Sequence, residues 1–128
     1  MFGTVAVVTF GVERIGRLMS GSGSGKAYSH TTWVVKAGCE DEFVRRWSEF
    51  AEWREAQGFS TRARLYRDID QPGRFVSFGS WVSLDSIRKW RNLAGFHERL
   101  AQLGELADSV EAEALEVVAA YGERRGSS

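Results

Sequence analysis

The residues best suited to chemistry lie together in one short segment of the chain. Trp90, Arg91 and Asn92 are consecutive, and His97 follows shortly after them. An indole ring can line a site for an aromatic ligand, a guanidinium or an amide can hydrogen-bond to an anion, and an imidazole can accept a proton near neutral pH. A ligand pocket is therefore expected beside this segment.

Two elements must position these side chains. Residues 75–81 alternate between two faces, which is the pattern of a strand. Ser83 is a suitable N-cap, and apolar residues then recur at helical spacing to about Ala107. Gly95 interrupts this run, so we expect two short helices or one broken helix.

A strand and a longer helix come earlier in the chain. Residues 29–36, SHTTWVVK, favour a strand that ends at the turn residues Ala37 and Gly38. Acidic residues then open a helix, where they complement the positive end of its dipole, and Gly58 ends it. The apolar stripe of this helix consists of Phe43, Trp47, Phe50, Ala51 and either Trp53 or Arg54.

The remaining strands complete the pattern. Residues 59–68 alternate basic with apolar side chains, and residues 69–73 contain Pro and Gly in the order of a hairpin turn. Near the end of the chain, Ala, Glu and Leu favour a helix, whereas the alternation favours a strand. We assign a strand to about Ala114–Tyr121, because the order strand, helix, strand, strand, helix, strand is that of a ferredoxin-like α+β fold.

Such a sheet has helices on one face and leaves the other face bare. The side chains expected on the bare face are Val34, Val76, Phe78 and Val117 or their neighbours. A second copy of the chain would cover this apolar surface, so a homodimer is expected.

Composition limits the class of protein. The 128 residues, 43% hydrophobic and 27% charged, suit one globular domain. Acidic and basic residues balance at 17 each, so no nucleic-acid partner is indicated. A single Cys suits a reducing, cytoplasmic location, and no apolar run reaches the ~20 residues of a membrane span.

We divide the chain into a flexible leader with a Gly/Ser linker (1–27), one domain (28–122) and a tail (123–128). Met19 is an alternative start to Met1. Two distant His and one Cys offer no metal-binding spacing, so no metal site is predicted.

Three stretches resemble the antibiotic biosynthesis monooxygenase family, over about Ser29 to Tyr121. They are TTWVVKAGCEDEF, LYRDIDQPGRFVSFGSW and SIRKWRNLAGFHERL. The resemblance implies a ferredoxin-like monomer that pairs into a dimeric α/β barrel, with a pocket between helices and sheet in each subunit. It also implies a monooxygenase that uses no metal or flavin and oxidises a small aromatic phenol or quinol with O2.

In that chemistry the protein holds the ring, favours the anion and shields the radical pair from water. Indoles suit the first task, cations and amides suit the second, and His97 could accept the proton. The candidate catalytic residues are Trp90, Asn92 and His97, and the candidate substrate-binding residues are Thr31, Trp33, Arg67, Trp81, Arg91 and Phe96. Each has a structural alternative: a core position for the indoles, a solvated charge for Arg91, a helix end for Asn92 and a surface position for His97.

Two alternative functions remain open. A dimer of the same fold that binds a small ligand without catalysis is one, because the candidate site lacks an unambiguous base. The resemblance also includes haem-degrading enzymes, whose helical Trp matches Trp90. Their axial His falls at Leu100 and their strand Asn at Thr31, so a haem site would need His97 as a displaced ligand.

Overall fold

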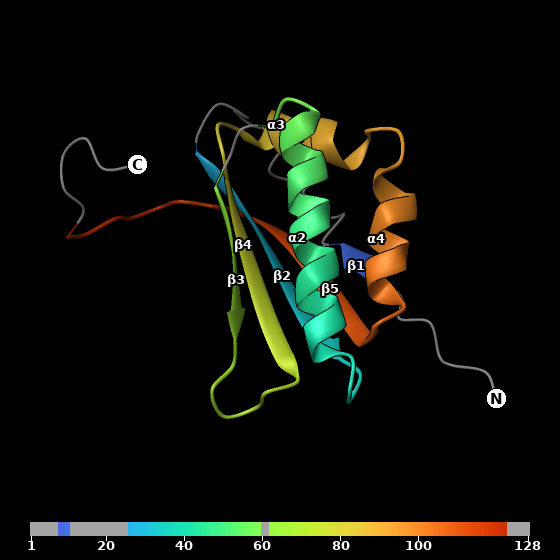
Figure 1. Ribbon diagram of the computed structural model, residues 1–128. Coiled ribbons are helices and arrows are strands. Elements are labelled where there is room, and N and C mark those ends of the chain that lie inside the picture. The colour runs from blue at the N-terminus through green and yellow to red at the C-terminus, as the bar shows by residue number, and fades with distance from the viewer. Residues whose placement is uncertain (1–7, 11–25, 60–61, 123–128) are drawn as a thin grey trace.

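A twisted sheet carries helices on one of its faces (Figure 1). The computed structural model describes residues 8–10, 26–59 and 62–122. In these ranges it has five strands, in the sheet order β1-β5-β2-β4-β3, and three helices. The bounds are β1 Val8–Phe10, β2 Ala27–Val35, α2 Glu40–Ala56, β3 Ala63–Arg67, β4 Arg74–Trp81, α3 Leu84–Arg91, α4 Phe96–Gly104 and β5 Ala107–Glu116. The predicted ferredoxin-like α+β fold is confirmed.

The two central strands place matching residues on the face that the helices cover. β2 pairs antiparallel with β4 on one side and with β5 on the other. In the β2–β4 register Ser29 lies opposite Gly79 and Thr31 lies opposite Ser77. Since alternate residues of a strand share a face, these four residues form one patch beneath the helices.

Aromatic packing anchors α2 to this face. Phe43 is fully buried between Trp33 and Phe75, with ring centroids 5.1 and 5.2 Å away. Phe43 and Trp47 are one turn apart, so the apolar stripe predicted from the sequence faces the sheet as expected.

Local signals in the sequence place the ends of the helices. The Ser83 hydroxyl accepts a hydrogen bond from the backbone N–H of Ser86 at 3.2 Å and caps α3. Gly95 has a φ of 90° and separates α3 from α4, which confirms the predicted break. Gly58, with a φ of 94°, follows the end of α2.

A carboxylate organises the hairpin between β3 and β4. Asp68 accepts backbone hydrogen bonds from Asp70 at 2.8 Å and Gln71 at 3.1 Å, and Arg74 donates to it at 3.0 Å. These bonds favour the charged form and lower the pKa of Asp68, the two backbone bonds first. The predicted turn at residues 69–73 is therefore a loop that folds around its preceding aspartate.

The last strand lies earlier in the chain than predicted. α4 ends at Gly104 and β5 spans Ala107–Glu116, whereas the sequence predicts a helix to about Ala107 and a strand at Ala114–Tyr121. Val110 and Ala112 are buried against the helices, while Val118 and Tyr121 are 87% and 102% exposed. The alternation predicts the right kind of element, but it continues past the point where the neighbouring strand β2 offers partners.

Two further differences concern strand extent. β1 pairs in parallel with β5, Val8 opposite Val110, although it lies in the segment interpreted as a leader. β3 spans only Ala63–Arg67 of the predicted 59–68, and residues 60–61 lie outside the described residues.

The described helices include none long and apolar enough to cross a bilayer.

Candidate functional site

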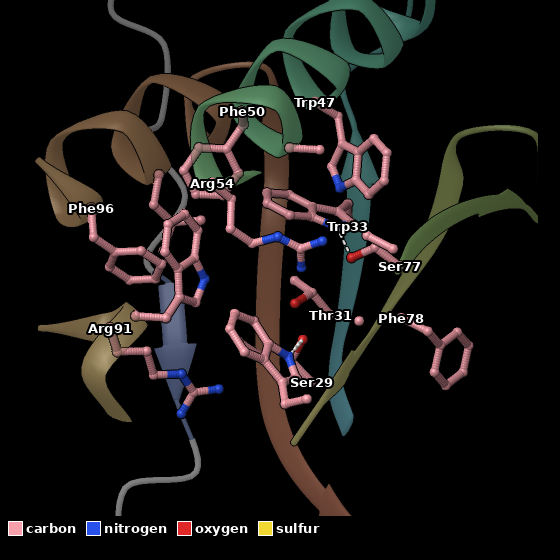
Figure 2. A pocket seen from close by; sticks show the side chains of 17 residues that line it. Ser29, Thr31, Trp33, Trp47, Phe50, Arg54, Ser77, Phe78, Arg91 and Phe96 are labelled. Atoms are coloured by element: carbon pink, nitrogen blue, oxygen red, sulfur yellow. Dashed lines mark hydrogen bonds between the residues drawn. The ribbon is translucent and has the colours of Figure 1, made fainter. Parts of the chain in front are cut away.

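A cavity of about 70 Å³ lies between the sheet and the helices. Figure 2 shows its side chains converging from β2 and β4 on one side and from α2, α3 and α4 on the other. Its lining consists of Ser29, Thr31, Trp33, Trp47, Phe50, Ala51, Arg54, Ala63, Ser77, Phe78, Gly79, Trp81, Trp90, Arg91, Phe96, Leu100 and Ala112. The site is thus aromatic with a polar floor.

Two indole–hydroxyl pairs form the floor. The Trp33 Nε1–H donates to Ser77 Oγ at 3.1 Å, and the Trp81 Nε1–H donates to Ser29 Oγ at 2.9 Å. Each serine oxygen accepts a hydrogen bond from an indole, so its own hydroxyl group can still donate one. The floor can therefore supply hydrogen bonds to a ligand oxygen.

Gly79 lies in this floor, where neighbouring side chains pack closely against the strand. A Cβ at this position would lie 2.8 Å from Ser29 Oγ, 3.1 Å from Arg54 Nη1 and 3.2 Å from Trp81 Nε1. Three polar atoms from three elements therefore surround the point that a side chain would occupy. Because glycine has no side chain, these three groups can pack closely against the strand.

Arg54 brings a cation to this part of the floor. It is 7% exposed, and its guanidinium lies 5.2 Å from the Trp81 ring centroid. Figure 2 shows the side chain extending from α2 toward the sheet, between the labelled indole of Trp33 and the Ser29 hydroxyl. Burial disfavours the charged form and lowers the pKa of Arg54, while its place in the last turn of α2 lets the helix dipole favour the cation.

Arg91 adds a second guanidinium to the lining from the end of α3. Burial lowers the pKa of Arg91 to about 10. This group is still protonated near neutral pH, so the cavity faces two positive charges.

Aromatic rings enclose the other side. Trp90 is 6% exposed, and its ring centroid lies 5.0 Å from Phe96, 5.3 Å from Phe50 and 6.2 Å from Trp81. Edge and tilted contacts of this kind fix the orientation of each ring. The arrangement can hold an aromatic ring against Trp90 and direct its oxygen toward the guanidinium groups.

The structure brings most of the predicted site residues together. Those that line the cavity are Thr31, Trp33, Trp81, Trp90, Arg91 and Phe96. Their roles toward a ligand remain predictions, because no measured contact with a ligand bears on them.

Three predicted site residues lie outside this lining. Asn92 is exposed at the end of α3, where its Nδ2 donates to the Arg88 carbonyl at 3.0 Å. His97 is exposed on α4, because the turn at Gly95 sets the phase of that helix so that Phe96 and Leu100 face inward. Arg67 lies over the Phe75 ring at 5.0 Å, at the end of β3 distant from Ala63. Their roles toward a ligand stay predictions, and the cavity described here does not include them.

Four further residues line the cavity although the sequence analysis does not predict them: Ser29, Arg54, Ser77 and Gly79. Arg54 interrupts the apolar stripe of its helix, and an arginine at an inward position is a signal for a buried charge. Ser29, Ser77 and Gly79 carry no such signal, since small residues in a strand are common on any face. Only the strand register shows that they meet.

The residues present do not fit a haem group. Leu100, at the position of the axial ligand in the haem-degrading branch, is apolar and 6% exposed. His97 is one turn away but faces outward. Among the described residues no cluster of His, Cys, Asp and Glu could hold a metal ion.

Comparison with known proteins finds relatives of the same architecture. The model of the family Antibiotic biosynthesis monooxygenase matches residues 27–102. SnoaB from Streptomyces nogalater, a cofactor-independent oxygenase, aligns with a TM-score of 0.69 and 20% identity over 77% of this chain and 99% of its own. Protein SO0527 from Shewanella oneidensis aligns with a TM-score of 0.62 and 13% identity over 73% of this chain and 92% of its own. A search of curated proteins finds no significant match.

Proposed function

The chain belongs to the antibiotic biosynthesis monooxygenase family, and from this premise we propose that it oxidises a small phenol or quinol with O2 without a cofactor. The observation that carries the proposal is the cavity itself, where aromatic walls meet the buried Arg54 and the half-buried Arg91. A similar fold serves SnoaB, a cofactor-independent oxygenase. The aromatic lining supports the proposed substrate class.

In the proposed reaction the substrate supplies all four electrons. A phenol binds as its anion, its proton having passed to water, and the cations of the cavity favour this form. The anion gives one electron to O2, and the resulting aryloxyl radical and superoxide combine to form a C–O bond. After a proton is taken up from water, the hydroperoxide loses water by cleavage of its O–O bond and of the C–H bond at the same carbon. A phenol and O2 thus give a quinone and water.

The size of the cavity implies movement on binding. A cavity of roughly 150 Å³ holds one benzene molecule, whereas this one measures about 70 Å³. A phenol therefore needs lining side chains to shift. The two arginine side chains can do so by rotation about their flexible stems, with the aromatic walls left in place.

Oxygen consumption by metal-free protein tests the proposal. With a panel of phenols and hydroquinones, we expect uptake above the protein-free rate and a quinone absorbance. Trp90→Ala removes the central wall, so we expect at least about a tenfold loss of rate through misplacement of the ring. Trp90→Phe keeps an aromatic wall and should retain more activity.

The matched control is Tyr121→Ala, since Tyr121 is fully exposed beyond β5. Near-UV circular dichroism establishes that each variant is folded. No uptake by the wild-type protein over the whole panel, or an undiminished rate in folded Trp90→Ala, would refute the function proposed for this cavity.

We also propose that the chain works as a homodimer through the face of the sheet opposite the helices. On this side Val34 and Phe78 are each 38% exposed and Tyr66 is 47% exposed. Although Phe78 borders the cavity, its ring points away from it (Figure 2) and contacts Tyr66. A monomer that leaves such an apolar surface uncovered is unfavourable in water.

The expected cytoplasmic location agrees with one free cysteine, Cys39.

Sedimentation at micromolar concentration checks the dimer. We expect twice the mass of the chain for the wild-type protein and a larger monomer fraction for Phe78→Lys, because the new charge would be buried in the interface. Val118→Lys, at an 87% exposed position beyond β5, serves as the control. A wild-type monomer under these conditions contradicts the proposed assembly.

A second candidate function is ligand binding without turnover. It is favoured by one observation, that the described residues of the lining include no imidazole or carboxylate to act as a base. Quenching of tryptophan fluorescence by phenols without oxygen uptake would support this alternative, and steady turnover would exclude it.

A further inference from the structure

The face of the sheet opposite the helices carries opposite charges at its two sides. Residues paired between neighbouring strands share a face, so the strand register gives rows of side chains that cross it. Two such rows are Arg64–Phe78–His30–Glu113 and Tyr66–Val76–Thr32–Glu111. Both rows end in a carboxylate on β5, and the first begins with a guanidinium on β3. The face is therefore basic along β3 and acidic along β5.

A groove of about 700 Å³ lies on the basic side of this face, over β3 and β4. Its lining includes Arg64, Tyr66, Phe78 and Tyr28, and the described lining contains no carboxylate. The Tyr66 and Phe78 rings meet edge to face with their centroids 5.9 Å apart, a contact that holds both rings in place. The groove thus suits an apolar segment that carries negative charge.

The strand β5 of a second copy has this character. Glu111, Glu113 and Leu115 alternate with residues that face the helices, and Leu115 is 36% exposed. Glu113 also has an interaction within its own chain. Among the described residues, neither the exposed Arg64 nor the exposed Glu111 takes part in an ion pair. These two charges can therefore serve a partner.

We propose that a second copy of the chain docks with its β5 over the groove between β3 and β4, so that Arg64 of each subunit lies against the acidic residues of the other subunit's β5. This inference rests on the homodimer proposed above. It adds the relative orientation of the two subunits and the charges that select it.

Two-fold symmetry offers two simple orientations for sheets packed face to face with aligned strands. An axis along the strands places β3 opposite the partner's β5, so each basic side meets an acidic side. An axis across the strands places β3 opposite the partner's β3, which brings the two Arg64 side chains together. Like charges that meet across an interface are unfavourable, so the charge pattern selects the first orientation.

The spacing on β5 suits a long cation. Glu111 and Glu113 are two residues apart on one face of the strand, a separation of about 7 Å. The flexible side chain of Arg64 can reach either carboxylate across the small angle between packed sheets. The partner's Leu115, next to these acids on β5, would cover the aromatic part of the groove.

Charge reversal tests the orientation, with sedimentation equilibrium giving the dissociation constant of the dimer. We expect Arg64→Glu and Glu111→Arg each to raise this constant at least about tenfold, because each creates two like-charge contacts in a symmetric dimer. An equimolar mixture of the two variants should dimerise about as tightly as the wild-type protein. In that heterodimer both contacts again join opposite charges.

Lys89→Glu and Glu98→Arg are the matched controls. They make the same changes of charge at exposed positions of α3 and α4, away from the proposed interface. Each should leave the dissociation constant unchanged. Near-UV circular dichroism checks that the variants are folded. The double variant Arg64→Glu/Glu111→Arg decides if one single variant does not fold, because it should dimerise as the wild-type protein does.

The outcomes separate this orientation from the homodimer on which it rests. If the wild-type protein is a dimer and both single variants keep its dissociation constant, the orientation is wrong, since the other axis pairs neither residue with an opposite charge. A mixture no tighter than its components, or a weakened double variant, also overturns the pairing. These results leave the homodimer standing. A wild-type monomer refutes the homodimer itself, and oxygen uptake tests the oxygenase independently of both.

Discussion

Gly79→Ala is expected to lower the rate of oxygen uptake about a hundredfold, the effect of misplacing a reacting group by about 1 Å, in a protein that still folds. The added methyl group would lie 2.8 Å from Ser29 Oγ and 3.1 Å from Arg54 Nη1. Both groups must then move away from the added methyl group, and the hydrogen bond from Trp81 to Ser29 is strained. The overpacking should cost about 1–3 kcal/mol of stability.

Gly73→Ala provides the comparison for this variant. A Cβ at Gly73 would be 3.4 Å from the Val35 carbonyl oxygen, which is ordinary contact, and the residue lies in the hairpin away from the cavity lining. Its rate should equal that of the wild-type protein. A folded Gly79→Ala variant with a wild-type rate would mean that the floor of the cavity at Gly79 takes no part in the reaction.

Phe43→Ala is expected to destabilise the protein by about 3–5 kcal/mol, the usual cost of removing a buried phenylalanine side chain. Phe43 is completely buried and joins α2 to both central strands through Trp33 and Phe75. Its loss leaves a hole between the helix and the sheet. Because α2 also carries Arg54, ligand affinity should fall together with stability.

Denaturation by urea measures this effect, with Val44→Ala as the matched control. Val44 is the next residue of the same helix and is 37% exposed, so truncation there removes little buried surface. We expect a change of no more than about 1 kcal/mol for this control. A comparable loss in the two variants would contradict the packing described for α2.

The sequence predicts the elements well wherever a local signal defines them. Ser83, Gly95 and Gly58 each act on the backbone within a few residues, so their effect can be inferred without the fold. The end of the last strand is different. Whether residues near Val118 pair depends on where β2 stops, and that is a property of the sheet rather than of the segment.

The same distinction between local signals and properties of the whole fold applies to the candidate site. Trp33, Trp81 and Trp90 are large and apolar, so their inward direction follows from strand or helix phase. His97 follows a turn at Gly95 whose geometry resets that phase, and no spacing rule carries across such a turn. Gly79 acquires its importance only because Arg54, distant in sequence, reaches the same point.

The central claim is that a ligand binds in the cavity between the sheet and the helices. The five indole N–H groups of Trp33, Trp47, Trp53, Trp81 and Trp90 report on it separately in a two-dimensional ¹H–¹⁵N spectrum, assigned by Trp→Phe variants. All of them except Trp53 line the cavity. On titration with a phenol that the protein consumes, we predict larger shifts for Trp33, Trp81 and Trp90 than for Trp53. Shifts confined to Trp53, or an unchanged indole spectrum at saturating ligand, would contradict the account.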